Sequence, residues 1–197
     1  METVSFTEMK HGTAEDYALL DRLERPFHAM TPDRILRHLA AQGEESLDGY
    51  PISRLGHATQ AATRAQDDGA DMDWIVSALL HDIGDGLAPQ NHDRFAAEII
   101  RPFVRAECTW VVEHHGIFQG YYYFEHLGWD PNERDKFKDH PHYQACVDFC
   151  ERWDQCSFDP AYPTRDLSHF EPLVREVFAR KAYDPDVIRE GYVSCLA

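Results

Sequence analysis

The sequence predicts an all-α, compact single domain, and three observations support this expectation. No run alternates apolar and polar residues for long enough to form a sheet, apolar residues recur at helical spacing, and short loops rich in Gly and Pro separate the helical stretches. The 197 residues are 43% hydrophobic, which is enough to bury a core without disulfides or a structural metal. We therefore expect one domain over residues 1–197.

Four helices are expected in the first half of the chain, over about 13–25, 31–43, 53–67 and 71–84. Thr13 and Ser53 suit N-cap positions, Pro32 suits a first helical turn, and Gly43 suits a helix end. Six more helices are predicted over roughly 91–104, 107–115, 131–137, 141–156, 168–180 and 185–194. The aromatic stretch 118–124 is interpreted as a loop between two of them.

The charge and the termini limit the function classes. A formal net charge of −16 repels a phosphate backbone or an anionic membrane surface, so we expect no nucleic acid and no membrane partner. No stretch approaches the roughly 20 apolar residues of a membrane span, and residues 1–12 do not have the layout of a secretion signal. The expected location is the cytoplasm.

Five cysteines, an odd number without a Cys-x-x-Cys pair, argue against a disulfide framework and a thiolate zinc site. We expect them to be reduced and to pack as small apolar groups. A homodimer is a possible oligomeric state.

The sharpest local signal is His81-Asp82 at the end of an apolar helix. Leaving either side chain unpaired in a buried position would cost about 1 to 3 kcal/mol, and a metal ion beyond the helix end would satisfy both. A carboxylate has two oxygens and can bridge two ions. A histidine that is merely hydrogen-bonded to a neighbouring carboxylate explains the dipeptide equally well.

Four further polar side chains lie on otherwise apolar helices, namely His57, His92, His115 and Asp154. Each alone is more typical of an ordinary core or surface residue. Together with His81-Asp82 they form an ordered set, His, His-Asp, His, His, Asp. His114 competes with His115 for its place, and we prefer His115 because of the Glu-His-His-Gly-Ile-Phe context around it.

This ordered set resembles the HD-domain superfamily, specifically its members with a dinuclear metal centre. The resemblance implies an HD-type helical bundle with a metal-ligand core at about 53–156. It also implies that His57, His81 and Asp154 hold a first ion, that His92 and His115 hold a second, and that Asp82 bridges the two ions.

The ligand types do not choose between two chemistries. Zinc, manganese or magnesium would activate water for phosphoester hydrolysis, whereas iron would allow dioxygen chemistry. The His57-to-His81 spacing, the run at 79–84 and Arg152-Trp153-Asp154 resemble the small diiron HD oxygenases, of the hydroxyphosphonate oxygenase and, more distantly, myo-inositol oxygenase type.

The second resemblance implies a mixed-valent Fe(II)/Fe(III) pair that uses O2 to cleave a C–P or C–C bond of a small hydroxylated substrate. Two alternatives stay open. One is a metal-dependent phosphohydrolase acting on a nucleotide or small phosphoester with Mn, Zn or Mg, and the other is a noncatalytic metal-binding module.

One departure concerns phosphonate recognition. Phosphonate oxygenases commonly continue the motif as His-Asp-x-Gly-His, whereas this chain has Asp85 at the last position. Four basic residues are considered as sources of positive charge, although each is more typical of a solvated surface: Arg54, Lys136, Lys138 and Arg152.

Candidate catalytic residues are Asp82, Glu113 and Asp85, the last two as acid or base groups or as residues that orient His115 and His81. The candidate substrate-binding residues could form a pocket for a hydroxylated substrate with an amino or trimethylammonio group, such as a 1-hydroxy organophosphonate. They are Tyr50, Gln119, Tyr121, Tyr122, Tyr123 and Arg152. The plainer interpretation is that the tyrosines pack a loop onto the domain.

Overall fold

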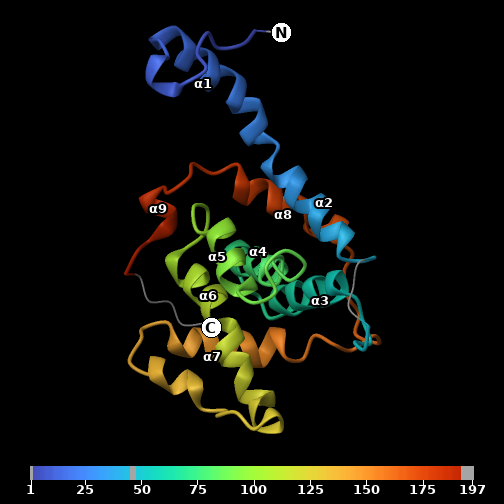
Figure 1. Cartoon of the computed structure of the whole chain (residues 1–197). Coiled ribbons are helices and arrows are strands. Elements are labelled where there is room, and N and C mark those ends of the chain that lie inside the picture. Colours follow the sequence, from blue (N-terminus) through green and yellow to red (C-terminus); the bar gives the residue numbers. More distant parts are fainter. Residues whose placement is uncertain (1, 45–47, 192–197) are drawn as a thin grey trace.

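The computed structural model describes residues 2–44 and 48–191, and within these ranges the chain is helical with no strand. The predicted all-α class is confirmed (Figure 1). The elements are η1 (Met9–His11), α1 (Ala14–Ala29), α2 (Thr31–Ala41), α3 (Arg54–Asp67), α4 (Met72–Leu80), α5 (His92–Ile100), α6 (Ala106–Tyr123), η2 (Phe124–Leu127), η3 (Glu133–Phe137), α7 (Tyr143–Phe149), η4 (Cys150–Asp154), α8 (Leu167–Phe178) and α9 (Pro185–Ile188).

Side-chain caps explain why the early helices begin where they do. Thr13 and Asp16 form a capping box at the start of α1. The Ser53 hydroxyl accepts a hydrogen bond of 3.0 Å from the backbone N–H of Gly56 at the start of α3. The Asp71 carboxylate does the same for Trp74 in α4, at 3.2 Å. These caps satisfy backbone donors that have no partner inside the helix.

The buried side chains form one hydrophobic cluster. In it α3 packs on α4, α6 packs on α5 and α7, and α8 packs on α2 and α4. Phe118, Phe149, Trp153, Phe170 and Leu39 are among its largest members. Because these helices share one core, α3, α4, α5, α6 and η4 are held in fixed positions around a single pocket.

The long helix α1 projects away from this core (Figure 1). Every residue from 21 to 30 is exposed, including Leu23, Phe27 and Met30. Within the described ranges, no helix combines the length and the apolar character that crossing a lipid bilayer requires.

Four predicted segments need correction. Residues 118–123 are not a loop, because α6 continues through Tyr123, with Phe118 buried in the core on the same side as His115. Residues 133–137 form a 3-10 helix, and the helix expected over 141–156 divides into α7 and the π-helical turn η4. The helix expected over 185–194 ends at Ile188 in α9. Residues 192–194 and Cys195 lie outside the described residues, and the other four cysteines are free thiols.

Candidate metal centre

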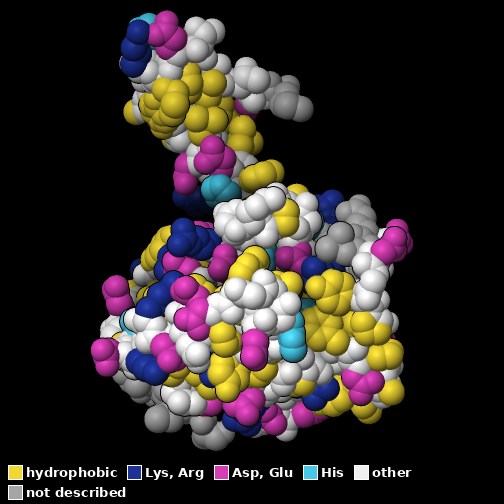
Figure 2. Space-filling model, turned by 60° about the horizontal axis from the view of Figure 1, so that its bottom comes forward, with side chains coloured by type: hydrophobic (Ala, Val, Ile, Leu, Met, Phe, Trp, Pro, Cys, Tyr) yellow, Lys and Arg dark blue, Asp and Glu magenta, His cyan; other side chains and the backbone are white. Residues whose placement is uncertain are grey.

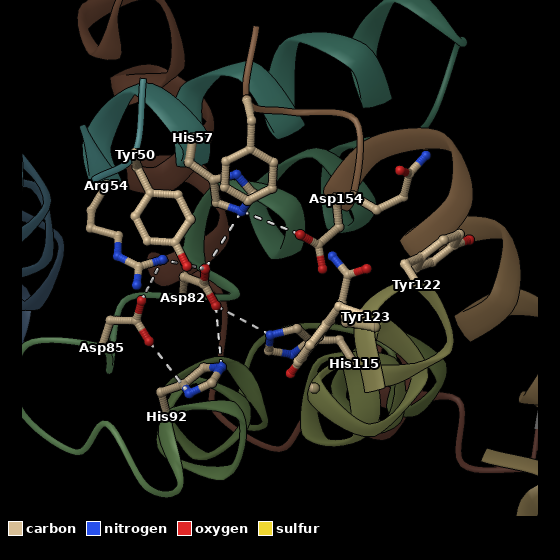
Figure 3. Close-up of a pocket in the computed structure, with 14 residues that line it drawn as sticks. Tyr50, Arg54, His57, Asp82, Asp85, His92, His115, Tyr122, Tyr123 and Asp154 are labelled. Atoms are coloured by element: carbon tan, nitrogen blue, oxygen red, sulfur yellow. Dashed lines mark hydrogen bonds and ion pairs between the residues drawn. The ribbon is translucent and has the colours of Figure 1, made fainter. Parts of the chain in front are cut away.

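The ligand atoms of six side chains from five helical elements come together in one cluster, and five of these side chains line a pocket (Figure 3). Helix α3 provides His57, the end of α4 provides His81 and Asp82, the first turn of α5 provides His92, α6 provides His115, and η4 provides Asp154. All are largely buried, and His92 is the most accessible, with its side chain 26% exposed.

Four of these residues form a first group of ligand atoms. Nε2 of His57 lies 3.1 Å from Nε2 of His81 and 3.2 Å from Oδ1 of Asp154. Oδ2 of Asp82 lies 3.5 Å from Nε2 of His57 and 3.6 Å from Nε2 of His81. Separations of this size are those of ligand atoms that surround one ion at bond lengths of about 2.0 to 2.2 Å.

A second group forms on the other oxygen of Asp82. Oδ1 lies 3.2 Å from Nε2 of His115 and 3.4 Å from Nε2 of His92. The two oxygens of one carboxylate thus face two different pairs of imidazoles, of which Figure 3 shows His57 on one side and His92 and His115 on the other. This is the arrangement that a carboxylate needs in order to bridge two ions.

Backbone carbonyls set the tautomers of three imidazoles. Nδ1 of His57 donates to the carbonyl of Ser157 at 2.9 Å. Nδ1 of His81 and of His115 donate to the carbonyls of residues 78 and 112, each at 2.7 Å. Because a carbonyl oxygen can only accept, each neutral ring carries its lone pair on Nε2, the atom that faces the centre.

Two features indicate that a cation belongs in this centre. In the neutral tautomers, the lone pairs of His57 and His81 face each other across 3.1 Å, which is repulsive unless a positive charge lies between them. In addition, Oδ2 of Asp154 is buried without a hydrogen-bond partner in the described part of the chain. The donor set of imidazole and carboxylate therefore fits a pair of metal ions.

The pKa shifts agree with this preference for positive charge. Burial alone would lower the pKa values of His57, His81 and His115, but the carboxylates of Asp82 and Asp154 outweigh it and raise them. Burial likewise opposes the ionised form of Asp82, yet the surrounding imidazoles hold its pKa well below the usual range. The carboxylates are thus ionised and suited to bind cations.

Five of the six candidate ligands border a cavity of about 470 Å³, and His81 lies buried behind them. Of the other candidate residues, Asp85, Tyr50, Gln119, Tyr122 and Tyr123 also line it. Because α6 is continuous, Gln119 and Tyr122 follow His115 at helical spacing on the same face, which explains how they reach the pocket.

Three candidates do not line this cavity. Glu113 binds Arg101 at 2.8 Å, and Tyr121 packs under the guanidinium of Arg134, whose Cζ is 3.7 Å from the ring centroid. Their positions in α6 turn both side chains away from the face of His115. Arg152 pairs with Asp68 at 2.9 Å. The structure therefore gives these three residues structural contacts outside the pocket.

The rival ligand His114 is also turned away. Its ring stacks on Trp110 with centroids 4.2 Å apart, and its Nδ1 donates to the Trp110 carbonyl. Of the two adjacent histidines, the structure brings only His115 to the centre.

Three lining residues are not among the candidates from the sequence, namely Gly116, Gln155 and Phe158. Phe158 stacks on the His57 ring with centroids 4.5 Å apart and on Tyr50 at 5.6 Å, and Gln155 directly follows Asp154. Of the four basic residues considered, Arg54 lines the pocket, whereas Lys136 and Lys138 pair with acidic residues of η3. Arg54 precedes His57 by three residues, a helical spacing that could have identified it.

Two comparisons with known proteins concern the part of the chain that carries the candidate ligands. The HD domain family model matches residues 54–152, about half of the chain and nearly all of the ligand-bearing region. The chain is also similar to the [1-hydroxy-2-(trimethylamino)ethyl]phosphonate dioxygenase (glycine-betaine-forming) of Leisingera caerulea. The identity is 25% over 166 residues, which covers 69% of this chain and 84% of that protein.

Proposed function

Because the chain belongs to the HD domain family, we propose that it is a dinuclear oxygenase that uses dioxygen to cleave a C–P or C–C bond of a small hydroxylated substrate. The observation that carries the proposal is the position of Asp82, with Oδ2 at 3.5 Å from His57 and Oδ1 at 3.2 Å from His115. A carboxylate placed in this way can bridge two ions about 3.5 to 4 Å apart.

Iron is the metal pair that we propose, in the mixed-valent Fe(II)/Fe(III) state. Four imidazoles and two carboxylates suit iron, manganese or zinc better than magnesium, which prefers oxygen ligands. The similar protein is named a dioxygenase, and this favours the redox-active metal.

The two ions would supply Lewis acidity toward a hydroxyl group or water, and iron would add the electrons that dioxygen chemistry requires. The chain itself fixes the ligand rings in advance, because backbone carbonyls hold Nδ1 of His57, His81 and His115. Phe158 covers one face of His57 and limits the approach of water from that side.

For a 1-hydroxyphosphonate substrate, the atoms and charges of the proposed reaction balance as follows. Such a substrate and one dioxygen molecule yield a carboxylate, a hydrogen phosphate ion and a proton, as the C–P bond breaks and the carbon is oxidised. The rings of Tyr122 and Tyr123 line the cavity, and aromatic faces attract ammonium groups. We therefore place an amino or trimethylammonio group of the substrate on that side, in line with the compound named for the similar protein.

Phosphate release with and without dioxygen tests the proposal against the phosphohydrolase alternative. The iron-loaded protein is incubated with 1-hydroxy-2-(trimethylamino)ethylphosphonate, hydroxymethylphosphonate and a panel of nucleotides. We expect phosphate to appear from a hydroxyphosphonate only in air and in proportion to the dioxygen consumed. Phosphate released from a nucleotide under nitrogen, without dioxygen uptake in air, would overturn the proposal and establish a phosphohydrolase.

A further inference from the structure

Arg54 is the one Lys or Arg among the described residues that line the cavity. It is the first residue of α3 and precedes His57 by three positions, so both side chains extend from the same face of the helix. Its side chain is 19% exposed, at the rim of a pocket otherwise lined by carboxylates, imidazoles, amides and aromatic rings. This residue has no role in holding the metal ions.

Several contacts fix the guanidinium beside the metal centre (Figure 3). Nη1 of Arg54 lies 2.9 Å from Oδ2 of Asp85 and 3.8 Å from Oδ2 of Asp82. Its Cζ lies 5.0 Å from the centroid of the Tyr50 ring, which itself stacks on Phe158. Asp85 also contacts Nδ1 of His92 at 3.4 Å. Arg54 is therefore held in a defined place between the rim and the bridging carboxylate.

This position is electrostatically costly once metal ions are bound. Three carboxylates and one guanidinium line the cavity, so two divalent cations would leave it with a positive charge. A guanidinium within 3.8 Å of the bridging carboxylate then lies beside like charges. An anionic group of a substrate between the ions and Arg54 would lower this repulsion. A planar guanidinium matches the geometry of a phosphonate or a carboxylate.

The ring of Tyr50 is a less suitable partner for a substrate ammonium group than the sequence indicates, because Arg54 already lies over it and Phe158 stacks on it. The part of the cavity beside Arg54 is therefore suited to a negative group, and the rings of Tyr122 and Tyr123 to a positive one.

We propose that Arg54 binds the anionic group of the substrate, a phosphonate or a carboxylate, and that Asp85 is the positioning residue that holds Arg54. The inference rests on the proposed function, because it assumes that the hydroxyl group of the substrate binds the metal ions beside Asp82. The substrate class that follows is a small hydroxylated anion bound at two points, its hydroxyl at the metal centre and its anionic group at Arg54.

The test measures binding to zinc-loaded protein, in which no dioxygen chemistry occurs. Calorimetry gives Kd for glycolate, its neutral isostere glycolamide, and hydroxymethylphosphonate, with wild type, Arg54→Gln and Arg54→Lys. Arg152→Gln is the matched control, because Arg152 also pairs with an aspartate but outside the cavity. Zinc content and thermal unfolding verify that each variant retains its fold and its ions.

We expect Arg54→Gln to raise Kd for the preferred anion by about 10- to 100-fold, which is the range for the loss of a charge-assisted hydrogen bond. The Kd of glycolamide should change by no more than about twofold. Arg54→Lys should keep part of the preference, and Arg152→Gln all of it. The stronger of the two anions identifies the group as phosphonate or carboxylate. Wild type that binds neither anion better than glycolamide, or a preference that survives in Arg54→Gln, would overturn the inference.

The outcomes separate this inference from the proposed function. If binding of anions depends on Arg54 but the protein takes up no dioxygen, the proposed oxygenase function is wrong and the inference about Arg54 stands. If the protein takes up dioxygen with a hydroxylated substrate that Arg54→Gln binds as well as wild type, the inference is wrong and the proposed function stands.

Discussion

Oδ1 of Asp82 lies 3.2 Å from Nε2 of His115, although 33 residues separate them in the sequence. The other oxygen of the same carboxylate faces His57 and His81. Among the described residues of the centre, Asp82 is the side chain whose two oxygens face both groups of ligand atoms, and the account of a dinuclear centre depends on it.

The first prediction concerns Asp82→Asn. An amide keeps the shape of the side chain but loses the charge and one of the two acceptor oxygens, so it cannot bridge two cations. We expect the metal content after gel filtration to fall from about two ions per chain to about one or fewer, and dioxygen uptake to be lost. A variant that retains two ions would show that Asp82 is not the bridge.

The second prediction compares two neighbouring histidines. His115→Ala removes a ligand of the second ion, whereas His114→Ala removes a ring that stacks on Trp110 away from the centre. We expect the first variant to lose about one ion per chain and the second to keep both. Metal analysis of the two proteins, prepared in parallel, measures this. Loss of an ion from His114→Ala alone would reverse the assignment.

The third prediction concerns the continuity of α6 through Gly120. A Cβ added there would lie 2.4 Å from Cε2 of Phe124, so the Phe124 ring would have to move. We expect Gly120→Ala to lower the free energy of unfolding by about 1 to 3 kcal/mol. Gly86→Ala is the control, since a Cβ at Gly86 meets nothing within 4 Å. Urea titration of both variants measures the difference, and equal stabilities would contradict the packing described.

The fourth prediction concerns the projecting helix α1. An isolated helix of this length is marginal in water, yet all residues from 21 to 30 are exposed and include Leu23 and Phe27, and the projecting part carries an apolar patch (Figure 2). We predict that α1 packs against a second copy of the chain in a homodimer.

Light scattering should therefore give about twice the chain mass of 22.8 kDa for wild type, and about one chain mass for Leu23→Asp combined with Phe27→Asp. Leu127→Asp, at a residue 55% exposed on a different element, is the control and should remain dimeric. A monomeric wild type would refute the homodimer.

Much of the fold follows from local signals in the sequence. Caps such as Thr13, Ser53 and Asp71 act within a few residues, so they predict helix starts without knowledge of tertiary contacts. The end of α6 depends instead on distant contacts. Gly116 and Gly120 favour a break locally, but the burial of Phe118 against Trp110 and Phe137 extends the helix.

The candidate metal ligands could be selected from the sequence because the order of these residues resembles that of a family, and the structure brings them together, but the residues around them could not be selected in this way. Whether Tyr121 reaches the pocket depends on the helical phase of a stretch that the sequence indicates as a loop. Glu113 lies in the expected helix 107–115, two positions before His115, a spacing that already places the two side chains on different faces. The π-helical turn η4 carries both Asp154, which reaches the centre, and Arg152, which pairs with Asp68, and no local signal predicts that turn. Phe158 reaches His57 from 101 positions along the chain, through tertiary packing alone.

A crystal structure of the iron-loaded protein, with data collected on both sides of the iron absorption edge, is the most direct test. The account predicts two anomalous peaks about 3.5 to 4 Å apart, one bound by His57, His81 and Asp154 and the other by His92 and His115, with one oxygen of Asp82 on each. A single peak, or two peaks of which Asp82 contacts only one, would contradict it.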